Sequence, residues 1–152
     1  MMQIQNRWMI KRDYDDVLRI ERQAAGQYAW NLADLQRELR QRDAIGTVAE
    51  CEHVVCGFAV FRILPRAYMV VNMVVASEAR RNRVGSQMVE RLVDKLSQKR
   101  TKLIVPVHET NLAAQLFLQS CGLRCVAVDG ETYRFVFDVT CDRVPKKLEG
   151  VV

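Results

Sequence analysis

One stretch, Val71–Leu96, constrains the fold more than any other part of the chain. It starts within the apolar run Val70–Val75, which is typical of a buried strand, and passes through a polar and basic link, Ala76–Arg83. The residues that follow are apolar at helical spacing: Val84, Met88, Val89, Leu92, Val93 and Leu96. The stretch therefore predicts a buried strand that leads through a basic turn into an amphipathic helix.

The basic turn has the features of an anion-binding site. The first turn of a helix leaves about four backbone N–H groups unpaired, and the helix dipole places partial positive charge there. Arg80, Arg81 and Arg83 add full charges at the same place. Such a turn suits a phosphorylated ligand, although an ordinary strand-to-helix connection with a solvated basic face shares these local features.

The composition is that of a globular protein. The 152 residues are enough for one domain with a sizeable core, and 49% of them are hydrophobic and 27% charged. The net charge of +5 is spread among acidic residues without a long basic run, so nucleic-acid binding is not indicated as the main role. No window approaches the ~20 apolar residues of a membrane span, and the start lacks a signal-peptide pattern. We expect a soluble, cytoplasmic protein.

The five cysteines do not predict a disulfide framework or a zinc ribbon, because their number is odd and no Cys-x-x-Cys pair occurs. Cys51, His53 and Cys56 could be metal ligands, but Cys121 and Cys125 have the wrong spacing for a second ligand pair. We therefore expect no metal site and interpret the thiols as small buried hydrophobes.

The N-terminal third predicts a strand followed by two helices. A short strand is expected over residues 7–11, and Asp13 is a candidate N-cap for a first helix that Gly26 ends. Asn31 can cap a second helix. Trp30, between the helices, is either a core anchor or a residue of a substrate groove.

The rest of the chain alternates strands with two helices. Strands are expected over residues 45–52, 54–64, 68–75, 102–107, 124–128 and 132–139, and helices over 84–96 and 112–121. Asn111 is the expected cap of the last helix, and Glu52–His53 and Asp129–Gly130 are the expected hairpin turns. Pro106 lacks an N–H group and must lie where the strand ladder is interrupted or at an edge. This order predicts a single α+β domain, with a mixed sheet of about seven strands flanked by about four helices, and a frayed tail over residues 142–152.

Two sequence motifs, together with this order of strands and helices, resemble those of the GCN5-related N-acetyltransferase superfamily. The family's pyrophosphate signature, Gln/Arg-x-x-Gly-x-Gly/Ala, corresponds to Arg80–Gly85, where Arg83 replaces the first glycine. The family's second motif, Asn-x-x-Ala-x-x-(Leu/Phe)-Tyr-x-x-x-Gly-Phe, corresponds to Asn111–Leu123, where Leu118 replaces the tyrosine and Leu123 the phenylalanine. The resemblance covers roughly residues 7–139, and the front half looks most like the ribosomal-protein alanine N-acetyltransferase branch.

The resemblance implies a site for acetyl-CoA. Met73, Val74 and Val75 would bind the pantetheine arm through their backbone. The residues implied to hold the pyrophosphate are Arg80, Arg81, Asn82, Arg83, Val84, Gly85 and Ser86. Asn111 would contact the pantetheine, although a helix cap alone also explains it.

The residues that the family uses to move protons are replaced in this chain. The resemblance places a general-base glutamate at the position of Pro106 and an acid tyrosine at the position of Leu118, and neither residue present can transfer a proton. His108 shares strand parity with Pro106 and is one substitute candidate, together with Glu109 and Tyr133. Each of the three is also explained as an ordinary surface or packing residue.

Two functions are consistent with this pattern. The first is an N-acetyltransferase that relies on positioning and acts on a protein, peptide or small-molecule amine. An α-amine, with a pKa near ~8, needs a base less than a lysine with a pKa near ~10.4. The second is a non-catalytic module that binds acyl-CoA or a partner. The acceptor's identity and the choice between monomer and homodimer are left open by the sequence.

Overall fold

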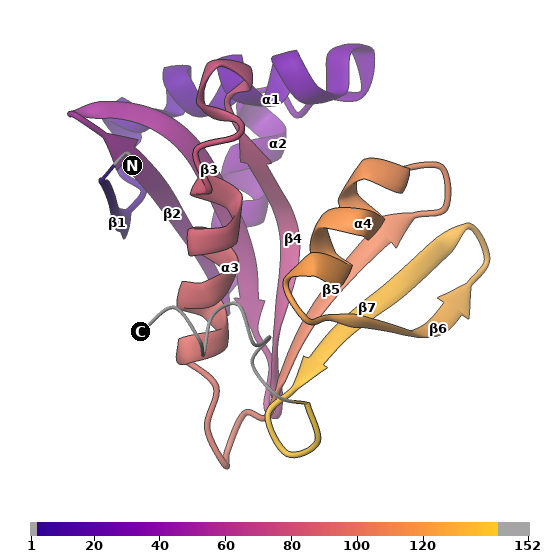
Figure 1. Ribbon diagram of the computed structural model, residues 1–152. Helices are drawn as coiled ribbons and strands as arrows, with labels where there is room; N and C mark the ends of the chain where they lie inside the picture. Colours follow the sequence, from indigo (N-terminus) through magenta and orange to yellow (C-terminus); the bar gives the residue numbers. More distant parts are fainter. Residues whose placement is uncertain (1–2, 143–152) are drawn as a thin grey trace. The chain divides into compact units, whose positions relative to one another are not determined.

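The computed structural model describes residues 3–142, with seven strands and four α-helices (Figure 1). The strands are β1 (Ile4–Trp8), β2 (Ala44–Cys51), β3 (Val54–Ile63), β4 (Ala67–Val75), β5 (Lys102–His108), β6 (Arg124–Asp129) and β7 (Thr132–Asp138). The helices are α1 (Tyr14–Ala25), α2 (Leu32–Leu39), α3 (Val84–Asp94) and α4 (Leu112–Ser120), with short 3₁₀ turns η1 (Lys11–Asp13), η2 (Gly26–Tyr28) and η3 (Ser77–Ala79). The tail expected to fray lies, beyond residue 142, outside the described residues.

The strand order is β1-β2-β3-β4-β5-β7-β6, which confirms the predicted mixed α+β sheet. The recorded β4–β5 pairs are parallel, and the recorded pairs of the other strands are antiparallel. The chain divides into two compact units, Met1–Ile63 with Val71–Met88 and Leu64–Val70 with Val89–Val152. None of the described helices is long and apolar enough to cross a bilayer.

The first unit contains an antiparallel meander of β1, β2 and β3. Trp8 pairs with Thr47, and Val48 pairs with Phe58. The β2–β3 turn has its two central residues, Glu52 and His53, at positive φ of 52° and 70°. This is the backbone conformation of a two-residue hairpin turn whose twist matches that of the strands, as the sequence predicted.

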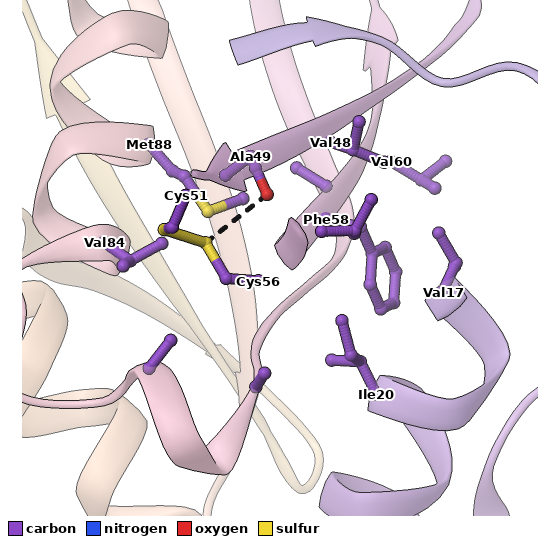
Figure 2. Close-up of a cluster of buried hydrophobic side chains, with 14 of the residues drawn as sticks. Val17, Ile20, Val48, Ala49, Cys51, Cys56, Phe58, Val60, Val84 and Met88 are labelled. Atoms are coloured by element: carbon purple, nitrogen blue, oxygen red, sulfur yellow. Dashed lines mark hydrogen bonds between the residues drawn. A yellow bond between two sulfur atoms is a disulfide. The ribbon is translucent and has the colours of Figure 1, made fainter. Parts of the chain in front are cut away.

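The core of the first unit has helices on both faces of this meander (Figure 2). On one face, Val17 and Ile20 of α1 lie against Phe58, and all three are fully buried. On the other face, Gly57 lies under α3: a Cβ placed on it would be 3.2 Å from Met88 Sδ. Adjacent strand residues point to opposite faces, so β3 joins the two halves of this core.

The second unit is built on β5, which pairs in parallel with Ala67–Met69 of β4 and antiparallel with β7. Alternate residues of β5 and β7 are buried and form one apolar face: Leu103, Val105, Val107, Phe135 and Phe137. Pro106 lies beyond the last recorded β4–β5 pair, Met69↔Ile104. The ladder to β4 thus ends before Pro106, whereas on the other side of β5 the ladder to β7 continues through the pair Pro106↔Arg134.

The helix ends follow the sequence prediction in three places and differ from it in one. Asn31 caps α2 by accepting a hydrogen bond from the Asp34 N–H (2.9 Å), Asn111 caps α4, and Gly26 ends α1 at a φ of 55°. Asp13 occupies the N-cap position of α1, as the sequence predicted, but its side chain makes no capping hydrogen bond. Its carboxylate accepts two hydrogen bonds from Arg7 and one from the Ile10 N–H. Arg7 belongs to β1 (Ile4–Trp8), which lies earlier in the chain than the strand expected over residues 7–11.

Candidate functional site

The link between β4 and α3 has an unusual backbone course. After η3, Arg81 and Arg83 adopt positive φ angles of 71° and 60°, while Asn82 between them does not. Alternation between left-handed and other conformations turns successive N–H groups toward one side, which forms a concave anion-binding loop. We call residues Arg80–Ser86 the anion loop.

Several backbone donors of the anion loop are unpaired. The Gln87 N–H donates to the Arg83 carbonyl (3.0 Å), so α3 begins just after Arg83. In the described part of the chain, no acceptor is recorded for the N–H groups of four residues: Asn82, Val84, Gly85 and Ser86. Unpaired donors at a helix N-terminus are the chemistry that a phosphate group requires.

Arg83 stands where the resembled signature has its first glycine, and it keeps the conformation that glycine adopts readily. A φ of 60° costs a non-glycine residue about 1–2 kcal/mol. The surrounding structure therefore holds the glycine-type turn in spite of the arginine side chain. Arg80, Arg81 and Arg83 are all exposed and lie in the same short segment as the unpaired donors.

Buried anchors fix the anion loop to the core of the first unit. Ala76 and Ala79 precede it, Val84 lies within it, and all three are at most 3% exposed. The Ala76 N–H donates to the Cys56 carbonyl (2.8 Å), and a Cβ on Gly57 would be 3.2 Å from the Val74 carbonyl oxygen. Close approach at Gly57 thus brings together β3, the end of β4 and the start of α3.

The expectation that the cysteines are all separate, buried thiols is wrong. Cys51 and Cys56, both buried, form a disulfide across the β2–β3 hairpin (Figure 2). Of the other three, Cys121 is buried but Cys125 and Cys141 are exposed. The bridge removes Cys51 and Cys56 as metal ligands, and no cluster of three metal-binding side chains occurs among residues 3–142.

The residues expected to hold the pantetheine lie in both units. Met73, Val74 and Val75 end β4, beyond the last recorded β4–β5 pair at Met69, and belong to the same unit as the anion loop. Asn111 belongs to the second unit. Its Oδ1 accepts a hydrogen bond from the Ala114 N–H (3.2 Å), so the capping role that the sequence predicted is present.

The proton-transfer candidates are not gathered into one site. His108 ends β5 and, like Pro106, is exposed. Tyr133 pairs with Val107, so it lies on the opposite face of the sheet from His108. Glu109 follows the strand, and its carbonyl accepts a hydrogen bond from Gln115 Nε2 (2.9 Å).

Both ring nitrogens of His108 are engaged. Nδ1 accepts a hydrogen bond from the Thr110 N–H (3.2 Å), and Nε2 lies 3.2 Å from Glu131 Oε2. Neutral histidine has one acceptor nitrogen, which here is Nδ1, so Nε2 carries the hydrogen and donates to Glu131. Nδ1 also lies 2.8 Å from Thr110 Oγ1, so His108 is held by contacts on both sides of its ring.

Pro106 and Leu118 carry no proton-transfer group at the positions that the resemblance assigns to the base and the acid. Pro106 is exposed opposite Arg134 on β7, and Leu118 is 2% exposed in the core. A buried leucine contributes apolar packing at this position.

One polar contact in the first unit was missed at the sequence level. Glu21 of α1 is 4% exposed and accepts hydrogen bonds from the Trp30 N–H (2.9 Å) and from Asn72 Nδ2 of β4 (3.1 Å). Trp30 itself packs against the core. A signal was present, because Glu21 follows Val17 by four residues on the apolar face of α1, and Asn72 interrupts an apolar strand.

Comparison with protein-family models matches residues 7–123 to the family described as "Acetyltransferase (GNAT) family". A comparison with curated protein sequences finds no match.

Solved structures of the same fold come from bacteria, archaea and plants. The ribosomal-protein-S18-alanine N-acetyltransferase of Escherichia coli has a TM-score of 0.72 at 17% identity, covering 88% of this chain and 91% of that chain. The PaiA N-acetyltransferase of Thermoplasma acidophilum, in complex with coenzyme A, has a TM-score of 0.75 at 16% identity, with coverage of 90% and 99%. NAA60 of Arabidopsis thaliana, in complex with a bisubstrate analogue, has a TM-score of 0.72 at 15% identity, with coverage of 90% and 98%. At these identities the likeness establishes a shared fold.

Proposed function

Because this chain belongs to the acetyltransferase (GNAT) family, we propose that it is an N-acetyltransferase that moves the acetyl group of acetyl-CoA to a primary amine. The observation that carries the proposal is the anion loop. Its alternating backbone, its unpaired N–H groups and its three arginines suit the diphosphate of coenzyme A.

The residues of this chain fit the cofactor in the following roles. Backbone N–H groups of Asn82, Val84, Gly85 and Ser86 would donate to the diphosphate, and the neighbouring arginines would neutralise its charge. The backbone of Met73–Val75 would orient the pantetheine arm, and the family resemblance makes Asn111 a further candidate contact for it. Bound in this way, acetyl-CoA supplies an acetyl group already activated as a thioester.

The acceptor that best fits the site is an α-amine. The amine nitrogen must be neutral when it forms its bond to the acyl carbon, and Pro106 and Leu118 offer no group to deprotonate it. An α-amine, with a pKa near ~8, is substantially neutral at physiological pH, whereas a lysine amine, with a pKa near ~10.4, is not. The C–S bond then breaks and the thiolate of coenzyme A leaves, while one of the two amine protons passes to solvent and the other stays on the new amide nitrogen.

We further propose that the acceptor is the N-terminus of a protein or peptide. One of the structural relatives supports this class, because it is named for the alanine of ribosomal protein S18. The resemblance of the front half to the ribosomal-protein alanine N-acetyltransferase branch points the same way. A small-molecule amine is the competing acceptor.

A non-catalytic acyl-CoA-binding module is the second candidate function. The observation that favours it is the pair of substituted positions, since Pro106 is exposed without a proton-transfer group and Leu118 is buried in the core. Such a protein would keep the anion loop and lose the chemistry.

Two measurements decide between these functions. Thermal unfolding is followed with and without acetyl-CoA, and release of the coenzyme A thiol is followed with three sets of acceptors. These are free-amine octapeptides, the same peptides with acetylated N-termini and one internal lysine, and a panel of small amines. We expect stabilisation by acetyl-CoA, and thiol release with free N-termini that accelerates as the pH rises toward about 8.

Each contrary outcome has a distinct meaning. Stabilisation without turnover on any acceptor supports the binding module. Faster turnover of the lysine peptides than of the free N-termini refutes the α-amine assignment. Absence of any stabilisation refutes both functions.

A further inference from the structure

The buried carboxylate of Glu21 has a fixed orientation and no cationic partner. Its Oε2 accepts from the Trp30 N–H and its Oε1 from Asn72 Nδ2, and no described residue forms an ion pair with it. Burying a charge without a counter-charge is costly. The two hydrogen bonds alone do not explain why a glutamate is present, because a neutral glutamine could fill the same space and make two hydrogen bonds.

What the carboxylate fixes is the direction of the Asn72 amide. A carboxylate can only accept hydrogen bonds, so Asn72 must present its Nδ2 group to Glu21 and its Oδ1 atom away from it. Oδ1 has no hydrogen-bond partner among the described residues. No buried side-chain oxygen in residues 3–142 lacks a partner, so Oδ1 must retain contact with solvent.

The position of Asn72 on β4 also supports a role in the site. The residue lies directly before Met73, whose backbone begins the segment proposed to orient the pantetheine arm. Glu21 holds Trp30 as well, immediately before the Asn31 cap of α2, so the α1–α2 connection is tied to the same strand.

We propose that Asn72 Oδ1 accepts a hydrogen bond from the amine of the acceptor, and that Glu21 is the positioning residue that keeps this oxygen facing the acceptor. The inference rests on the proposed N-acetyltransferase function and adds a named recognition group to it. One amine N–H donates to Oδ1 while the nitrogen lone pair attacks the acyl carbon. The contact strengthens as the nitrogen becomes positively charged, and the amide takes no proton.

This arrangement can be tested by exchanging hydrogen-bond donors and acceptors between residues 21 and 72. In Glu21→Gln, the glutamine oxygen must accept from the Trp30 N–H, so its NH₂ group faces Asn72. Asn72 must then flip and present a donor to the acceptor amine. In the double variant Glu21→Gln with Asn72→Asp, the glutamine NH₂ donates to the new carboxylate, whose second oxygen again faces the acceptor.

We expect Glu21→Gln to lower kcat/KM for the best free-amine octapeptide by about 10- to 100-fold, with the loss largely regained in the double variant. Asn72→Leu, which keeps the size and removes the oxygen, should lose about as much as Glu21→Gln. Acetyl-CoA affinity should stay within about twofold in all three, since the anion loop is untouched. Asn6→Leu, at a half-buried position of β1, is the matched control and should keep full activity.

A second readout separates this inference from the proposed function. The same peptide is titrated by calorimetry into each variant saturated with coenzyme A, where no transfer can occur. If the native protein releases no thiol from acetyl-CoA, the proposed function fails. The peptide affinities of the variants then test by themselves whether Asn72 binds the acceptor amine. The inference is overturned if Glu21→Gln matches the native protein within about twofold, or if the double variant is no better than Glu21→Gln.

Discussion

Replacement of Gly57 by alanine tests how the core holds the anion loop. The added Cβ would lie 3.2 Å from Met88 Sδ, 3.2 Å from the Val74 carbonyl oxygen and 3.6 Å from Val84 Cγ1. The methionine side chain can yield, but the carbonyl oxygen belongs to the backbone of β4 and moves only if the strand moves. Relief of the crowding therefore shifts β4 or α3 by a few tenths of an ångström.

Two magnitudes follow from this contact. Overpacking of this kind costs about 1–2 kcal/mol of unfolding free energy and lowers Tm by about 2–8 °C. A shift of the start of α3 also misplaces several N–H donors of the anion loop at once. A loss of about 1.4 kcal/mol of binding free energy corresponds to a tenfold weaker Kd for acetyl-CoA.

Gly46→Ala is the matched control for Gly57→Ala. Gly46 lies on the neighbouring strand β2, where an added Cβ would be 2.9 Å from Leu39 Cδ2 and 3.3 Å from Met9 Cβ, away from α3. It should also cost stability but leave acetyl-CoA affinity unchanged. Calorimetric titration of both variants, beside their thermal unfolding, checks the pair. If Gly57→Ala loses stability and binds acetyl-CoA as tightly as the native protein, the proposed link between Gly57 and the anion loop is refuted.

Two further predictions concern the stability of the first unit. Hydrogen bonds from Arg7 hold the pKa of the buried Asp13 carboxyl below its usual value, so its stabilising effect is present above about pH 4 and is lost as the pH falls through the lowered pKa. Asp13→Asn should therefore lower the unfolding free energy by about 2–3 kcal/mol at pH 7, and urea titrations should show this difference shrinking below about pH 4; a constant difference would contradict the assignment. The Cys51–Cys56 bridge closes a short loop, and its reduction should cost about 2 kcal/mol. Thiol titration of the unfolded protein should find three thiols before reduction and five after it, and five at the outset would refute the bridge.

Features set by local sequence could be predicted. Asn31 and Asn111 cap helices because their side chains reach N–H groups three residues ahead, which depends only on neighbouring residues. Likewise, the positive φ at Glu52 and His53 follows from the short distance between two apolar runs. The position of the anion loop was also predictable, since a buried strand and an amphipathic helix bracket it.

Features set by tertiary contacts could not be predicted. Asp13 has the sequence features of an N-cap, but its carboxylate accepts hydrogen bonds from the Arg7 side chain instead. The disulfide depends on the β2–β3 register and its irregularity at Ala49/Glu50, which no residue spacing indicates. Glu21 and Asn72 are 51 residues apart, so their contact exists only once α1 packs against the strands. In each case, the side chain's role is fixed by a partner distant in sequence.

The most direct test of the central claim is a nuclear magnetic resonance titration of the backbone amides of the anion loop. ¹H–¹⁵N spectra are recorded with acetyl-CoA and, separately, with acetyl-pantetheine, which lacks the diphosphate. The amide signals of Asn82, Val84, Gly85 and Ser86 should shift with acetyl-CoA alone, because only the diphosphate accepts their hydrogen bonds. Equal shifts with both ligands, or no shift with either, would contradict the assignment of this loop as the diphosphate site.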